Sequence, residues 1–283
     1  MNRFIVWLMV RGMVIWALLS PGQAEPVRFG FPLEKVDQWH GHQRHVFEVA
    51  GKTAWVVVPD RPREGRHWTW VTEFPDAFLE RTGVPTLLKE HGVYHAHVSD
   101  FNRLGCAEQL QVMSAFYELM VQKGFAKKPV LIGLSRGGFM AYRWAVAHPQ
   151  NIAGIYGDAP VCDLKSWPAG QGQGKGSPSD WQQAKKLYGW TSDEQVNAFQ
   201  ENPVDDKPLA ILAKHRIPLY HVVGRSDDVV PVAENSAIVE RKYRQLGGSI
   251  TVIAHEAGHH PHGLDDPAPT VNFIVQALQQ ANR

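Results

Sequence analysis

A serine that could act as a nucleophile stands in the segment Gly-Leu-Ser-Arg-Gly at 133–137. The apolar run at 129–132 predicts a strand before it, and an apolar helical spacing follows as far as His148. Side chains at 133 and 137 would clash where strand and helix nearly touch, which explains the glycines. The turn pushes the hydroxyl of Ser135 out at the carboxyl end of a sheet, a geometry called the nucleophile elbow.

Such a serine needs a base, and the base needs a carboxylate that orients it. The apolar run at 218–224 predicts a buried strand, and Asp227 and Asp228 follow its end. Either could be this carboxylate, although both also fit solvated turn positions. Asp158, after the predicted strand at 155–157, is a rival candidate that is also explained as a structural residue.

The candidate bases lie in a histidine cluster after the last predicted strand, at 249–253. A catalytic histidine belongs on this loop, within reach of both the serine and the carboxylate. His259, in Gly-His at 258–259, fits that position best. His260 and His262 stay as alternatives, because the sequence does not show which ring points inward.

A metal site is the other interpretation of this cluster, which also contains His255. Gly258 and Pro261 prevent one helix from presenting His255 and His259 on a single face. We therefore expect no metal in the active site and assign at least two of these histidines to the surface of the loop.

Residues 1–24 are predicted to be a secretion signal. Arg3 gives a positive start, an apolar stretch interrupted by Arg11 follows, and Gly22 and Ala24 are small residues at the cleavage positions. Neither uninterrupted apolar piece reaches the roughly 20 residues that span a bilayer. We therefore expect one mature domain at 25–283, exported to the periplasm or outside the cell and free of the membrane.

The charge of the chain limits the partner classes. Residues 1–24 contain two arginines and no acidic residue, so their removal would change the formal net charge from +1 to −1. A near-neutral mature chain argues against nucleic acid or an anionic membrane as the main partner. Cys106 and Cys162 could pair in an oxidising compartment or stay as buried thiols. The oligomeric state is not indicated.

Strands and helices are predicted to alternate along most of the chain. Alternating residues at 45–49 predict an antiparallel hairpin at a sheet edge, and apolar runs predict strands at 54–59, 67–74 and 93–99. Helical stripes follow near 110–120, 239–246 and 271–278. This order is typical of an α/β fold with a mostly parallel central sheet and helices on both faces.

Residues 163–207 interrupt this alternation with closely spaced glycines at 170, 172, 174 and 176 and with several aromatic residues. An insertion at this point would lie over the strand ends, so we expect it to form a short lid that shapes the substrate site.

Taken together, these motifs resemble the α/β-hydrolase superfamily, and more narrowly a group of exported bacterial hydrolases similar to carbohydrate esterases. The shared segments are Gly-Leu-Ser-Arg-Gly-Gly (133–138), Ile-Tyr-Gly-Asp-Ala-Pro-Val-Cys-Asp (155–163), Lys-Ser-Trp-Pro (165–168), His-Val-Val-Gly (221–224), Asp-Asp-Val-Val-Pro (227–231), Leu-Gly-Gly (246–248) and Gly-His-His-Pro-His (258–262).

The resemblance implies an α/β-hydrolase fold with Ser135 as nucleophile and a histidine within 259–262 as base. It favours Asp227 as the acid, because Gly-x-x-Asp-x-x-Val-Pro is a pattern common in such enzymes. The backbone N–H of Arg136 and one near Phe74 are the expected oxyanion donors, although Phe74 is followed by a proline, which has no N–H. The guanidinium of Arg136 could hold an acidic or hydroxylated substrate, or could form a structural salt bridge.

We therefore predict a serine carboxylic-ester hydrolase, without metal or organic cofactor, that acts on short acyl or methyl esters of carbohydrates. The tryptophans suit the apolar faces of sugar rings, although packing of the lid would also explain them. They are Trp68, Trp70, Trp167, Trp181 and Trp190. A peptidase or acyltransferase of the same fold and a non-catalytic binding protein are the alternatives.

Overall fold

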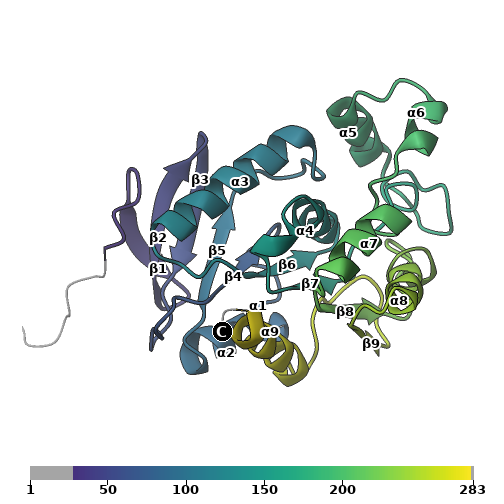
Figure 1. Ribbon diagram of the computed structural model, residues 1–283. Coiled ribbons are helices and arrows are strands. Elements are labelled where there is room, and N and C mark those ends of the chain that lie inside the picture. Colours follow the sequence, from purple (N-terminus) through teal and green to yellow (C-terminus); the bar gives the residue numbers. More distant parts are fainter. Residues whose placement is uncertain (1–27, 282–283) are drawn as a thin grey trace, which may run out of the picture.

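A nine-stranded sheet runs through residues 28–281, the part of the chain that the computed structural model describes (Figure 1). The predicted secretion signal at 1–24 lies outside the described residues. In chain order the strands are β1 (Lys35–Trp39), β2 (His42–Val49), β3 (Lys52–Val57), β4 (Trp68–Val71), β5 (Tyr94–Val98), β6 (Val130–Leu134), β7 (Gly154–Asp158), β8 (Leu219–Gly224) and β9 (Ile250–His255).

The spatial order of the strands is β1-β2-β3-β5-β4-β6-β7-β8-β9. From β5 to β9 every neighbouring pair is parallel, whereas β1, β2 and β3 form an antiparallel edge. The edge hairpin and the mostly parallel sheet predicted from the sequence are thus confirmed. Because the carboxyl ends of parallel strands meet at one edge, the loops after β4, β6, β7, β8 and β9 are gathered there.

Helices cover both faces of the sheet. In chain order they are α1 (Leu79–Thr82), α2 (Val84–Glu90), α3 (Ala107–Gln122), α4 (Arg136–Ala147), α5 (Pro178–Tyr188), α6 (Asp193–Ala198), α7 (Asp206–Lys214), α8 (Ser236–Gln245) and α9 (Ala268–Ala281), with short 3₁₀ turns at Pro149–Asn151 and Val232–Glu234. Helices α3, α4, α7 and α8 pack on one face, and α2 and α9 on the other (Figure 1). No helix of the described residues is long and apolar enough to cross a membrane.

The core between α3, α4 and the sheet is rich in aromatic rings. Trp68 and Trp70 on β4 are fully buried, and Trp70 meets Trp144 edge-on with the ring centroids 4.9 Å apart. Helices cover both faces of the sheet at β4, so every residue of this strand is buried, whichever face its side chain points to. The expectation that Trp68 and Trp70 could face a sugar substrate is therefore wrong.

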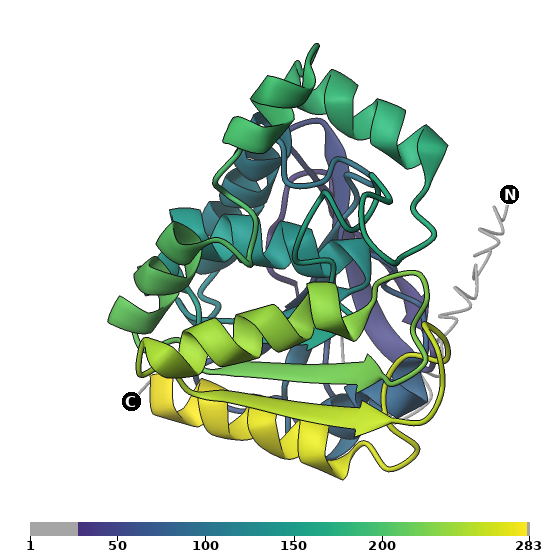
Figure 2. The same ribbon diagram turned by 90° about the vertical axis from the view of Figure 1, so that its right-hand side faces the viewer.

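Residues 163–207 contain α5 and α6, which lie above α4 and α8 at the top of Figure 2. Trp167, Trp181 and Trp190 pack into a separate apolar cluster with Phe139 and Val230 of the neighbouring loops and helix. The predicted segment overlaps α7 by two residues, because α7 begins at Asp206 and is an ordinary crossover helix to β8.

Cys106 and Cys162 are both buried and are not joined to each other.

Burial shifts the protonation of three histidines on the inner strands β5 and β8. The ring of His221 lies between the hydroxyls of Tyr142 and Ser236, at 2.8 and 2.9 Å. Burial lowers the pKa of His221 to about 3, that of His95 to about 3 and that of His97 to about 4, from an ordinary value of 6.5.

The lowered pKa values of these histidines predict that the protein loses stability in acid. As the pH falls below 6.5, the unfolded chain takes up protons that the folded chain does not, so the free energy of unfolding decreases until the folded pKa is reached. Each histidine contributes up to about 1.4 kcal/mol per pH unit. In urea unfolding between pH 6 and 4.5, His221→Gln should reduce the slope by about 1 kcal/mol per pH unit. The exposed His40→Gln is the control, and an equal reduction in both variants would contradict the prediction.

Candidate active site

Ser135 occupies a strained turn between β6 and α4. Its backbone has φ 51° and ψ −122°, outside the usual regions for a residue with a side chain. A Cβ atom at Gly138 would lie 2.4 Å from the Cβ of Pro160, and one at Gly133 would lie 2.6 Å from the Cα of Gly138. The glycines therefore permit the close approach of strand and helix. The sequence predicts this role for Gly133 and Gly137, and the structure shows that Gly138 has it too.

Backbone hydrogen bonds hold this turn in place. The N–H of Ser135 donates to the carbonyl of Asp158 at 2.8 Å. The carbonyl of Ser135 accepts from Gly138 at 2.9 Å and from Val161 at 3.0 Å. These contacts fix the serine relative to β7, so the strained conformation is determined by its surroundings.

His259 connects the serine to a carboxylate. Its Nε2 lies 2.9 Å from the Oγ of Ser135, and its Nδ1 lies 2.8 Å from the Oδ2 of Asp227. A carboxylate only accepts, so Nδ1 carries the hydrogen and Nε2 is left to accept from the serine hydroxyl. The order of contacts is that of a nucleophile, a general base and an orienting acid.

Asp227 is held more firmly than its neighbour Asp228. The other oxygen of Asp227 accepts the N–H groups of Val229 and Val230 at 2.9 and 2.8 Å, and its side chain is only 1% exposed. Asp228 points to solvent and pairs with Lys175 of the 163–207 segment. The structure thus brings Asp227, not Asp228, to the histidine.

Asp158 and His262 form a second carboxylate–histidine pair beside the first. The Nδ1 of His262 lies 2.7 Å from Asp158, whose other oxygen accepts from Gly263 at 2.8 Å and from Tyr156. Asp158 therefore does not contact His259, which supports its structural interpretation.

His260 is exposed and stacks on Phe78. Within residues 28–281, only His259, His260 and His262 form a group that could hold a metal ion.

Two backbone segments beside Ser135 are placed to meet an anionic oxygen. Arg136 is the first residue of α4, so its N–H has no acceptor within the helix. The loop after β4 contacts the same turn, because a Cβ at Gly137 would lie 2.9 Å from the Cβ of Glu73. The next residue, Phe74, has φ 54°, a strained value for a residue with a large side chain.

Comparison with known proteins identifies the family. Residues 18–273 match the family model described as the alpha/beta hydrolase family. The chain belongs to this family. No curated protein sequence gives a significant match.

Several solved structures share the fold of this α/β hydrolase. An S-formylglutathione hydrolase from Agrobacterium tumefaciens has 14% identity and a TM-score of 0.59, with 88% of this chain and 97% of that chain covered. A Pyrococcus furiosus esterase has 13% identity and a TM-score of 0.56, with 88% and 98% covered. A Mycobacterium tuberculosis puromycin-hydrolysing peptidase has 15% identity and a TM-score of 0.57, with 88% and 39% covered.

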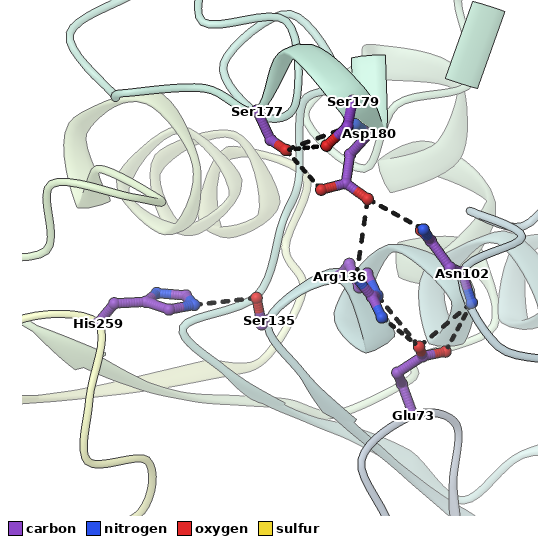
Figure 3. A network of polar contacts seen from close by, with 8 residues as sticks. All are labelled: Glu73, Asn102, Ser135, Arg136, Ser177, Ser179, Asp180 and His259. Carbon is purple, nitrogen blue, oxygen red and sulfur yellow. Dashed lines mark hydrogen bonds and ion pairs between the residues drawn. The ribbon is translucent and has the colours of Figure 1, made fainter. Parts of the chain in front are cut away.

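The side chain of Arg136 in this α/β hydrolase is engaged by carboxylates (Figure 3). Its Nε and Nη2 donate to Glu73 at 3.0 and 2.9 Å, and its Nη1 lies 3.8 Å from Asp180. The guanidinium also covers the ring of Phe74, at 4.8 Å from its centroid. This geometry supports the structural salt bridge that the sequence left open and not the recognition of an acidic substrate.

Glu73 is fully buried, and this burial raises its pKa, although the charge of Arg136 and the N–H of Asn102 oppose the shift. Asn102 also donates to Asp180 at 3.0 Å, and Asp180 accepts from Ser177 at 2.5 Å (Figure 3). Sequence reasoning missed Glu73, Asn102 and Asp180. Only Glu73 gave a signal, as a charged residue near the end of the apolar strand predicted at 67–74.

The Arg136–Glu73 contact predicts a specific loss of stability. A lysine at 136 presents a single point charge and cannot reproduce the two hydrogen bonds. Arg136→Lys should lower the free energy of unfolding by about 2 kcal/mol, the range for hydrogen bonds to charged groups. The measurement is urea unfolding at pH 7.

Arg225→Lys is the matched control for this prediction. Arg225 pairs with Glu256, and these side chains are 61% and 87% exposed. Such a surface pair contributes less than about 1 kcal/mol. Equal losses in the two variants would show that the buried pair has no special role.

Proposed function

We propose that this α/β hydrolase is a serine carboxylic-ester hydrolase. The observation that carries the proposal is the hydrogen-bonded series Ser135–His259–Asp227, at 2.9 and 2.8 Å. His259 accepts the serine proton at Nε2 while the serine oxygen attacks the ester carbonyl. Asp227 holds the ring in the required tautomer and stabilises the imidazolium that forms.

The oxyanion of the tetrahedral intermediate would be stabilised by the backbone N–H of Arg136 and by an N–H near Phe74. The proton on His259 then passes to the leaving alcohol, and the acyl group stays on Ser135. A water molecule, deprotonated by the same histidine, releases the acid and restores the serine. A backbone donor that is aimed at this oxygen contributes about 100-fold or more in rate.

An ester is a better proposal than a peptide for this chain. The hydrolase and the esterase named above are covered over 97% and 98% of their lengths, whereas the puromycin-hydrolysing peptidase is covered over only 39%. The match with that peptidase therefore concerns only part of a longer protein. Peptidase, acyltransferase and binding functions remain as outcomes of the experiments below.

The first test compares three isosteric or truncating variants on p-nitrophenyl acetate. Ser135→Ala should abolish turnover, and Asp227→Asn should lower kcat by about 10⁴-fold, because the ring of His259 is left in the wrong tautomer. Asp158→Asn, at the second buried pair, is the matched control and should retain most of the kcat per folded molecule.

A fluorophosphonate probe separates the remaining classes. A folded wild-type protein that never reacts at Ser135 would favour the binding protein. Turnover that survives Ser135→Ala, or an Asp158→Asn loss as large as that of Asp227→Asn, would overturn the assigned triad.

We further propose that the substrates are short acyl or methyl esters of carbohydrates, met by a mature domain (25–283) outside the cytoplasm. The segment beside the triad supports short, polar substrates. It places Lys175 against Asp228 and Asp180 against Arg136, so charged groups lie next to Asp227 and to the residue that follows the serine. A lid for long acyl chains would instead present a continuous apolar surface.

Chain length is the measurable consequence. On p-nitrophenyl esters, kcat/KM should fall by about 10-fold or more from acetyl to octanoyl, since a long acyl chain would take water from the charged groups beside the site without replacing their hydrogen bonds. Acetylated, feruloylated and glucuronoyl-ester sugars are then compared on the same scale, with Ser135→Ala as the blank. A preference for long chains without activity on any sugar ester would overturn the substrate class and leave the triad intact.

A further inference from the structure

Three histidine rings meet on the loop after β9. The ring centroids of His259, His260 and His262 lie 4.8 to 5.1 Å apart, and each pair is edge-to-face. Each ring can offer one nitrogen such that the three nitrogens lie within 4.8 Å of one another. The proposed catalytic base is therefore also part of a nitrogen cluster that its reaction does not require.

Two of these rings are oriented in the way that metal-binding histidines are. The Nδ1 of His259 faces Asp227 at 2.8 Å, and the Nδ1 of His262 faces Asp158 at 2.7 Å. A carboxylate behind the ring fixes the tautomer and raises the basicity of the other nitrogen. Both rings thus keep Nε2 as the nitrogen that can bind a cation.

The same carboxylates supply charge. The side chains of Asp158 and Asp227 are each only 1% exposed, so their negative charges act through a weakly screening interior. A divalent ion next to the rings would be attracted by both. Imidazole nitrogens select zinc, copper or nickel over magnesium or calcium, which prefer oxygen ligands.

The third ring can move to complete the site. Tetrahedral zinc binds histidine nitrogens at about 2.0–2.1 Å, which requires the nitrogens to approach to about 3.4 Å. His260 is exposed, and outside the histidine cluster its ring stacks on Phe78, at 5.7 Å between centroids. A rotation of this side chain costs little, because the contact that it leaves is on the surface.

We propose that His259, His260 and His262 bind a divalent transition-metal ion such as Zn²⁺, and that this ion reversibly blocks Ser135. The ion takes the Nε2 lone pair of His259, which is the acceptor for the serine proton. The hydrogen bond between this nitrogen and Ser135 is replaced by the metal bond. The ion is an inhibitor and not a cofactor, and only this inhibitory effect rests on the proposed function.

The binding experiment does not depend on activity. Wild type and Ser135→Ala are titrated with Zn²⁺ in competition with a chromophoric zinc chelator. One ion per chain is expected, and His260→Gln should weaken its binding by about 100-fold, the upper range for damage to a histidine metal site. His255→Gln is the matched control, because His255 ends β9 just before this loop and lies outside the group of three.

The second readout is the reactivity of Ser135 toward a fluorophosphonate probe and p-nitrophenyl acetate. One equivalent of Zn²⁺ should slow both at least 10-fold, EDTA should restore them, and His260→Gln should remove the effect when rates with metal are divided by rates with EDTA. Circular dichroism checks that each variant is folded.

The proposal is overturned by Zn²⁺ binding that is equally strong in His260→Gln, or by bound Zn²⁺ that leaves the reactivity of Ser135 unchanged. If wild type proves inactive on every ester, the proposed function fails. The chelator titration still decides whether the histidines hold the ion.

Discussion

The close approach of β6 and α4 is the constraint on which the rest of the structure depends. Strand and helix meet so tightly that Gly133 and Gly138 have no room for a Cβ atom, and Ser135 between them takes a strained φ of 51°. This strain persists because hydrogen bonds from Gly138 and Val161, and one to Asp158, hold the turn from both sides. The close approach of β6 and α4 sets the direction of the Ser135 hydroxyl. Every residue that acts with the serine must therefore lie beside that hydroxyl.

The partners form two carboxylate–histidine pairs: Asp227 follows β8, Asp158 ends β7, and both histidines lie on the loop after β9. Asp227 contacts His259, and Asp158 contacts His262, with both carboxylates almost completely buried. A buried carboxylate is costly unless it is hydrogen-bonded, and each here accepts backbone N–H groups in addition to its histidine. The two pairs look alike in chemistry, yet only one reaches the serine. The other ties β7 to the loop that carries the base.

The ion pair of Arg136 and Glu73 connects the serine turn to the loop after β4. Glu73 is buried at the end of β4, and Arg136 begins the helix after the serine, so their contact joins the two backbone segments proposed to bind the oxyanion. Asp180 on α5 adds the 163–207 segment to the same network. Burial raises the pKa of Glu73 in spite of its partner, so desolvation opposes the pair, while its hydrogen bonds fix the geometry of the two segments.

The sequence by itself determined the elements and the local chemistry. Apolar runs and helical stripes predicted the mostly parallel sheet, because burial on both faces of a strand leaves a direct record in residue type. The glycine spacing around Ser135 predicted the turn, since only glycine tolerates that approach. The sequence could not decide which way a side chain points, or which residues far apart in the chain contact each other. Whether His259, His260 or His262 turns toward Ser135, and whether Asp227, Asp228 or Asp158 lies behind it, depends on loops brought together by the sheet.

The network of Glu73, Asn102 and Asp180 was not predicted for the same reason, because contacts between residues 29 to 78 positions apart leave no periodic pattern. The tryptophans illustrate the limit most plainly. Trp68 and Trp70 read equally well as sugar platforms and as core, and only the covering of β4 by α3 and α4 decided that they are core. Residue type states what a side chain can do, whereas tertiary packing decides which surface of it remains free to do so.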